Sequence, residues 1–328
     1  MSLQRQLPGK LALDTTFFMH FGHNVHDRSM WGGSFNRPIN LVDPNLIYTH
    51  KGAVEAKVPN PFYNLLPADK MPGELRVQKE VSVLQLLKTY PHYVNLTEMF
   101  RDGIHNRYYA LQIQVQRRMA EGMSLTFGYT YNRESRTEFF NNVYNTDVYY
   151  DKKTWIDRRQ PRHYLRVAGT WELPFGRGRR YFSGVSRFVD LLIGGWATSH
   201  WFMLQGGQLL TFGPALVTGD PRENVPEGRA FNPNVFKILP PFTPRTNPWY
   251  YDGLRGPRFW SLDSTLVKYF PITERVKLEL RFEFYNLPNH FIESNPDTRI
   301  GSGTMGMSTS IFPGNYGREV QYTARIHW

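Results

Sequence analysis

Hydrophobic and polar residues alternate along much of this chain. Between residues 123 and 131, apolar and aromatic side chains occupy the odd positions: Met123, Leu125, Phe127, Tyr129 and Tyr131. Ser, Thr or Gly fills the even positions. Because successive side chains of a β-strand point to opposite sides, this two-residue period predicts a strand with one apolar and one polar face. The same period occurs in residues 111–116 and 320–328, and the short segment 120–122 predicts a tight hairpin.

The pattern predicts nine strands, most of them long enough to cross a bilayer at a tilt. They cover residues 2–7, 10–21, 108–119, 123–133, 163–174, 195–205, 260–270, 276–286 and 318–328. Short and long connections alternate between them, and the long ones cover residues 22–107, 134–162, 206–259 and 287–317. Short periplasmic turns and long extracellular loops are typical of outer-membrane barrels. The sequence therefore predicts an all-β, transmembrane antiparallel β-barrel wall, with an added helical turn at residues 188–193.

The composition excludes a helical membrane protein. The hydrophobic content is 41% and the mean hydropathy is -0.49. The longest apolar stretch, residues 191–197, is far shorter than the roughly 18 residues that a spanning helix needs. Aromatic residues make up 15% of the chain, which suits the aromatic girdles of transmembrane barrels. The absence of cysteine excludes disulfides, thiol catalysis and thiolate metal sites.

The chain is basic, with a net charge of +11. Such a charge suits an anionic partner, and Arg177, Arg179 and Arg180 form a local cluster. No recognition helix or base-stacking platform is evident, so we expect no nucleic-acid partner. We interpret the arginines as solvated charge at the membrane edge, and we expect outer-membrane lipid and lipopolysaccharide as the surroundings.

An odd number of strands leaves the predicted sheet open. Unpaired N–H and C=O groups at its two edges would each cost several kcal/mol in hydrocarbon, and bacterial barrels close with even strand numbers. Residues 1–5 also lead directly into a polar alternating strand, without an apolar signal segment. These observations favour the C-terminal part of a longer protein.

Three segments carry a resemblance to a known family. Residues 108–131 contain Y-x-A-L-Q, then R-R, a Gly turn and a final Y-T-Y; residues 171–181 contain E-L-P-F-G-x-G-R; residues 254–290 contain L-R-G-P and a closing R-x-E-x-x-N-x-x-N series. In this order they resemble the C-terminal barrel region of TonB-dependent outer-membrane receptors, specifically the Oar-like group. Members of that group carry an N-terminal carboxypeptidase-regulatory-like domain, a plug and a barrel of about 22 strands.

The resemblance implies an importer of a scarce nutrient of the siderophore, glycan or peptide class. In such an importer, a TonB-type energy complex acts through the plug, and this sequence contains no counterpart of the plug or the regulatory-like domain. The resemblance also implies that the barrel-assembly machinery reads the terminal residues Tyr322, Ile326 and Trp328. The alternative is that these three side chains simply face lipid.

Two polar series are expected to face the lumen. They comprise Gln112, Gln114, Gln116, Arg118, Lys277, Glu279, Arg281 and Glu283. In a functional interpretation Arg281 and Glu283 contact a plug or line a translocation path. The alternative is ordinary cross-strand pairing of opposite charges.

The long segment 22–107 is expected to fold over the barrel mouth, since loops above about 15 residues are usually functional or disordered. Ligand contacts are predicted here and in segment 206–259, where Trp249, Tyr250 and Tyr251 offer stacking surface. The alternative is that these aromatics pack within their own loop.

We expect no cofactor, no metal and no enzymatic activity. His20, His23 and His26 have a spacing that would converge on a helix, but they lie at a strand end and should splay apart. Phosphate loops, zinc helix motifs and nucleophile elbows are missing from the sequence.

Two other classes remain compatible with the pattern. One is a passive porin or structural surface protein. The other is a soluble β-sandwich binding module, because periodicity alone does not say whether the apolar face meets lipid or a protein core.

Overall fold

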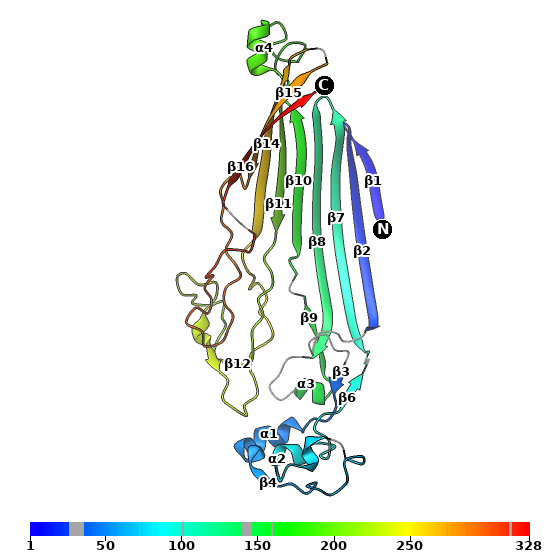
Figure 1. Ribbon diagram of the computed structural model, residues 1–328, viewed down its shortest axis with the longest axis vertical. Coiled ribbons are helices and arrows are strands. Elements are labelled where there is room, and N and C mark those ends of the chain that lie inside the picture. Colours follow the sequence, from blue (N-terminus) through cyan, green and yellow to red (C-terminus); the bar gives the residue numbers. More distant parts are fainter. Residues whose placement is uncertain are drawn as a thin grey trace.

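The computed structural model describes residues 1–25, 36–71, 73–99, 102–139, 146–158, 160–273, 275–314 and 317–328. Figure 1 shows a tall sheet of long strands with its short turns at one end and its long loops at the other. We call these the short-turn end and the long-loop end. Among the described residues, no helix has the length and apolar character that a membrane crossing requires.

Nine long strands form the sheet in chain order, each antiparallel to its neighbours. Their bounds are β1 (Ser2–Leu7), β2 (Leu11–Val25), β7 (Ile104–Ala120), β8 (Met123–Phe139), β10 (His163–Glu172), β11 (Trp196–Gln205), β14 (Phe259–Pro271), β15 (Lys277–Tyr285) and β16 (Glu319–His327). A tenth strand, β9 (Lys153–Asp157), pairs with the far part of β8. The predicted all-β fold and each of the nine predicted strands are therefore confirmed.

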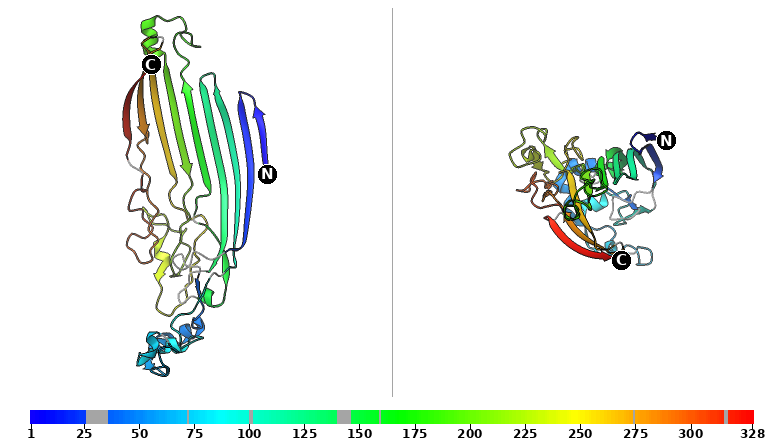
Figure 2. Two further views of the ribbon diagram at one scale, coloured as in Figure 1. Left: turned by 45° about the vertical axis from the view of Figure 1, so that its right-hand side comes forward. Right: turned by 90° about the horizontal axis from the view of Figure 1, so that it is seen from above.

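The sheet is curved, and β1 and β16 form its two edges (Figure 2). The described strands make this one large sheet and three small two-stranded ribbons, and no second large sheet covers either face. The soluble β-sandwich interpretation is therefore wrong, because a sandwich buries its apolar faces between two stacked sheets.

Strands β7 and β8 extend further than the sequence pattern predicts. The prediction ended β8 at residue 133, but pairing continues through Asn106 and Arg136, and β9 then joins β8 from Ser135 onward. Apolar alternation stops there, since Arg133, Glu134, Ser135 and Arg136 occupy consecutive positions. Backbone pairing alone continues the strands.

At the short-turn end, the connection between β10 and β11 contains helix α4 (Arg187–Ile193). The predicted helical turn is confirmed. Ser186 caps the helix, its hydroxyl accepting a hydrogen bond from the Val189 N–H at 3.4 Å. The close packing of this turn requires glycine at Gly176, whose φ is 109° and where a Cβ would lie 2.4 Å from the Asp190 carboxylate.

At the long-loop end, residues 36–71 and 73–99 form a small unit, which we call the first loop lobe. It contains β3 (Asn36–Pro38), α1 (Pro44–His50), η1 (Lys51–Glu55), β4 (Lys57–Pro59), η2 (Glu74–Arg76), β5 (Glu80–Ser82), α2 (Val83–Leu86) and β6 (Thr97–Met99). Two small apolar cores stabilise it, one around Ile47 and Val54 and the other around Leu75 and Val81.

The first loop lobe lies beyond the strand ends and contacts two other loops (Figure 1). The Tyr150 hydroxyl, just after α3 (Thr146–Tyr149), donates a hydrogen bond to Asp43 at 2.9 Å. Phe242, from a loop far along the chain, packs against the core around Ile47. The lobe is thus fixed to the other loops by specific contacts.

Residues 206–258 and 286–314 form a second loop lobe. It contains β12 (Ala215–Val217), η4 (Pro233–Val235) and β13 (Phe236–Ile238). Its buried core joins side chains from both segments: Leu210, Phe212, Ala215, Phe231, Phe236, Leu254 and Met305. Two long loops that lie apart in the sequence therefore fold together around one apolar centre.

Candidate functional site

The strand register divides the sheet into two chemically distinct faces. One face is polar: Gln114 lies opposite Asp14 on one side and Gly128 on the other, and Gly128 lies opposite Arg166. The pairing continues from β10 through β11 and β14 to β15. On β15 the same face carries Arg281, which lies opposite Thr323 of β16. Both predicted polar series therefore lie on one continuous face, which we call the polar face.

Near the short-turn end, the polar face forms an open groove of about 810 Å³ between β1, β2 and β7. Three of the predicted residues line it: Gln114, Gln116 and Arg118. On the opposite wall, the Gln4 amide donates a hydrogen bond to Asp14 at 2.8 Å. The side chains of this groove can form hydrogen bonds with water or with a polar partner.

The charged row on β15 is paired within itself and with β16. Glu279 is 3% exposed and accepts a hydrogen bond from Arg281 Nε at 2.9 Å. It accepts a second from His327 at 2.8 Å when the imidazole carries a proton on Nε2. Arg281 also lies 3.7 Å from Glu283. These contacts fit the simpler alternative of charge pairing along a polar wall, and they leave Lys277 outside the pairs described.

The opposite face is apolar. Phe127 lies opposite Val167, and Val167 opposite Phe202. Leu280 and Ile326 belong to the same face through the pairing of β14, β15 and β16. No second layer of the described chain covers this face. A single sheet with one uncovered apolar face and one polar face is the expected form of a membrane barrel wall.

The three terminal residues with a predicted assembly role lie at the outer edge of the sheet. Tyr322 and Ile326 are on the apolar face of β16 and are 72% and 54% exposed. Trp328 follows β16 and is also exposed. Recognition of these residues by the barrel-assembly machinery stays a prediction from the resemblance.

The apolar face becomes charged at the long-loop end. Position 131 on β8 is still Tyr, but the next residue on this face is Arg133, whose Nε lies 3.2 Å from Asp157. The Asp157 carboxylate also accepts a hydrogen bond from the Ser135 hydroxyl at 2.8 Å and pairs with Arg162. This change from apolar to charged side chains marks the boundary of the hydrocarbon layer.

Asp157 is buried, and burial alone would raise the pKa of its carboxyl. The hydrogen bonds from Ser135 and Arg133 and the charge of Arg162 outweigh burial, so the pKa lies below its ordinary value. The carboxylate stays ionised and joins β8, β9 and the start of β10. The sequence pattern does not indicate this group, because its members are separated by a loop and follow no periodic pattern.

A second groove, of about 430 Å³, lies on the polar face where the strands meet the long loops, a region that we call the mouth. Tyr108, Asn132, Glu134, Tyr164 and Arg166 are among its lining residues. Hydroxyl, amide, carboxylate and guanidinium groups thus converge where the strands meet the loops. Such a lining suits a polar solute rather than an apolar one.

The three residues of the predicted aromatic run 249–251 lie in two different surroundings. Tyr251 packs against Phe212 and Phe236, with ring centroids 5.6 and 6.1 Å away. This residue belongs to the core of the second loop lobe, as the alternative interpretation expects. The Tyr250 hydroxyl accepts a hydrogen bond from the Asp157 N–H at 3.4 Å, and Trp249 lines a small cavity beside Asp157. Tyr250 and Trp249 are therefore at the mouth, whereas Tyr251 is not.

The predicted histidine positions that the structure describes do not form a common site. His20 lies on the polar face opposite Tyr108, and His23 stacks edge-on with His105 at 5.5 Å. His26 lies outside the described residues. Among the described residues, no three metal-ligating side chains of the His, Cys, Asp or Glu type lie together.

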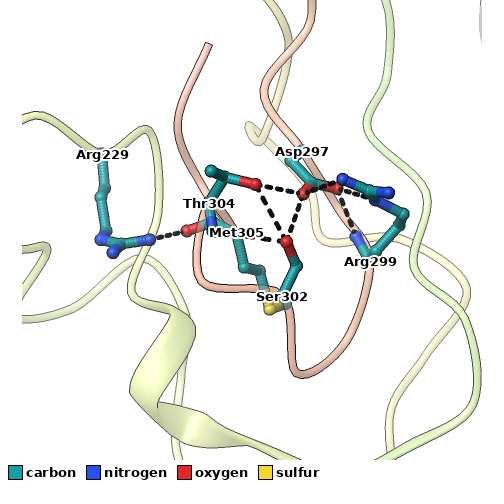
Figure 3. Close-up of polar contacts among 6 residues, drawn as sticks. All are labelled: Arg229, Asp297, Arg299, Ser302, Thr304 and Met305. Carbon is teal, nitrogen blue, oxygen red and sulfur yellow. Dashed lines mark hydrogen bonds and ion pairs between the residues drawn. The ribbon is translucent and has the colours of Figure 1, made fainter. Parts of the chain in front are cut away.

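A carboxylate-centred turn closes the second loop lobe (Figure 3). Asp297 accepts hydrogen bonds from the Arg299 N–H at 3.0 Å and from the hydroxyls of Ser302 and Thr304 at 2.7 and 2.8 Å. The Arg299 guanidinium adds two more, each at 2.9 Å. Arg229 then donates to the carbonyl of Met305, which joins this turn to the lobe core.

We expect the Asp297 turn to make the second loop lobe sensitive to acid. The contacts from Arg299, Ser302 and Thr304 hold the pKa of Asp297 well below its ordinary value of 3.8. A lowered folded-state pKa means that the stabilisation is present at neutral pH and is lost as the pH falls below 3.8. Protease cleavage of residues 286–314 in intact membranes should rise several-fold across that range.

The substitution Asp297→Asn should raise cleavage at neutral pH and remove most of this pH dependence. Asp220, whose pKa is lowered to about 2 by Arg222, offers the matched control, because Asp220→Asn affects a different turn of the same lobe. An unchanged acid profile in Asp297→Asn would contradict the assignment.

The fold and the two-faced sheet define the class: an outer-membrane β-barrel protein. The chain belongs to the outer membrane beta barrel domain family, whose family model matches residues 1–321. No curated protein and no solved structure was found to match the chain. The protein is accordingly located in the outer membrane of a Gram-negative-type bacterium.

Proposed function

We propose that this chain forms part of the wall and the outer loops of a TonB-dependent importer for a scarce polar nutrient. The observation that supports this most is the continuous polar face, which runs from β1 to β16 opposite an apolar face. In a closed barrel such a face lines a hydrated passage. The motifs in residues 108–131, 171–181 and 254–290 support the receptor-like form of this proposal.

In this function, Arg166 and Glu134 at the mouth groove would contact the solute, and Trp249 would flank it. The rows on β15 would face the lumen or a plug. Energy would come from a TonB-type complex acting through a plug outside this chain. The residues here supply wall, loops and binding surface, and we propose no reaction chemistry for them.

A passive pore is the second candidate, favoured by the uncovered polar face and its open grooves. A pore of this kind also needs a hydrated polar face, but it requires neither a plug nor an energy complex. Ion conductance of the purified protein distinguishes the two.

Cysteine accessibility tests the hydrated passage, since the chain has no native cysteine. We expect Gln114→Cys to react with a membrane-impermeant maleimide in intact outer membranes and the adjacent Val115→Cys, on the apolar face, to remain unreactive. Equal reaction at both positions would contradict the passage.

Planar bilayers then separate importer from pore, using the protein purified from its own outer membrane. A plugged importer should give no steady conductance in potassium chloride, whereas a passive pore conducts continuously. Steady conductance would contradict the importer and support the pore.

A further inference from the structure

The connection between β10 and β11 carries an apolar surface that no described part of the chain covers. Phe182, Phe188 and Leu192 are 62%, 83% and 73% exposed, and Val189 is also exposed. Among the short turns, those at residues 8–10 and 121–122 hold only polar or small residues. This surface, which we call the α4 patch, projects from the short-turn end of the sheet (Figure 1).

Hydrogen bonds join the helix of the α4 patch to the preceding turn. The Asp190 carboxylate accepts a hydrogen bond from the Arg177 N–H at 2.6 Å, which joins the helix to the preceding turn. The Gly194 N–H donates to the Asp190 carbonyl at 2.8 Å and ends the helix. The exposed apolar side chains are therefore held in place on an ordered turn.

The helix is attached to the apolar side of the wall. Trp196 and Lys268 lie opposite one another on the apolar face. The Trp196 indole N–H donates to the Leu192 carbonyl at 2.8 Å, and the Lys268 ammonium, which is buried, donates to the Gly194 carbonyl. Both side chains thus satisfy carbonyls at the C-terminal end of α4. This places the helix at the edge of the surface that meets lipid, away from the polar face.

The level of the helix corresponds to a membrane interface. Trp171, on the apolar face at the end of β10, is 46% exposed, and tryptophans gather at the water interfaces of transmembrane barrels. Arginines surround the same turn: Arg177, Arg179, Arg180 and Arg187 are exposed. Arg179 pairs with Glu172 at 3.1 Å. The other three form no ion pair within the described part of the chain, and the Arg180 guanidinium lies 5.5 Å from the centre of the Tyr181 ring.

From this arrangement we propose that the α4 patch docks into the phospholipid leaflet at the short-turn end of the barrel. Phe188 and Leu192 enter the boundary between headgroups and acyl chains, and Arg177, Arg180 and Arg187 contact lipid phosphates. Apolar side chains flanked by cations are the chemistry of helices that lie in a membrane interface. The docking rests on the membrane placement of the sheet and is independent of what the barrel transports.

Depth-dependent fluorescence quenching tests this proposal. The protein, purified from its own outer membrane, carries Phe188→Cys labelled with an environment-sensitive fluorophore and is reconstituted into phosphatidylethanolamine liposomes with phosphatidylglycerol. We expect blue-shifted emission and strong quenching by lipids with a spin label near the headgroup. Glu121→Cys, in a polar turn at the same end, is the matched control and should show neither effect.

Leu192→Cys provides a second position if the first variant does not fold, and heat-modifiable gel mobility verifies the barrel in each case. A folded barrel whose label at both positions stays unquenched would overturn the proposal. Disulfide formation between the unlabelled Phe188→Cys sites of two copies, together with no quenching of the labelled protein, would overturn it in favour of a protein interface.

The arginines have their own test. Each arginine near an anionic membrane surface strengthens binding by about fivefold. Quenching should therefore be stronger in liposomes with phosphatidylglycerol than in phosphatidylethanolamine alone. The combined variant Arg177→Gln, Arg180→Gln, Arg187→Gln should lose this difference. Unchanged dependence on phosphatidylglycerol would overturn the phosphate contacts.

Discussion

Replacing Val167 with arginine should destabilise the membrane-inserted protein by about 2–4 kcal/mol, the cost of this side chain on the lipid face near the bilayer midplane. Val167 lies on the apolar face between Phe127 and Phe202, midway along β10. Its side chain has no polar partner there, and an arginine would place an unpaired charge in hydrocarbon. We expect the urea midpoint of unfolding in liposomes to fall, together with the amount of folded protein in the outer membrane.

Its neighbour Ala168 is the matched control. It lies on the polar face opposite Thr126 and Trp201, so an arginine there can reach water. Ala168→Arg should change the urea midpoint much less than Val167→Arg. Equal losses in the two variants would mean that the face carrying Phe127 does not meet lipid.

Replacing Phe231 with alanine should unfold the second loop lobe while leaving the barrel wall intact. Phe231 is fully buried and meets Phe212 edge-on at 5.1 Å. Removing a buried phenylalanine typically costs 3–5 kcal/mol, which is a large fraction of the stability of so small a core. We expect rapid protease cleavage within residues 206–258 and 286–314 in intact membranes.

Ile238→Ala provides the comparison within the same lobe, because Ile238 is 73% exposed. It should leave protease resistance nearly unchanged. Heat-modifiable mobility should be normal in both variants, since neither residue belongs to a strand of the large sheet. If Phe231→Ala also abolished heat-modifiable mobility, the lobe and the wall would have to fold as one unit.

The wall could be predicted from sequence because lipid and water impose a strict two-residue period on each strand. For example, the apolar side chain of Val115 and the polar side chain of Gln116 indicate which face of β7 each residue occupies. The two-residue period ends at the long-loop end, because polar residues such as Arg133 and Ser135 there occupy the face that is apolar in the rest of β8. There β8 is extended by backbone pairing with β9, and such pairing cannot be recognised from the pattern of side chains.

The structure of the loop lobes could not be predicted from the sequence, for a different reason. The core of the second lobe joins Phe212 to Met305, which lie far apart in the sequence, and no periodicity links them. The same core explains why the aromatic run at 249–251 was only partly informative: its composition predicted contact surface, but Tyr251 packs inward. The α4 turn was predicted, whereas its attachment to Lys268 depends on register and could not be.

In the described part of the chain, the apolar cores of the two loop lobes contain no side chain from the strands of the large sheet. This arrangement makes the protein modular: the loop lobes can accumulate substitutions or insertions without disturbing the membrane-spanning wall. Selection could therefore change the lobes while the embedded wall stays constant.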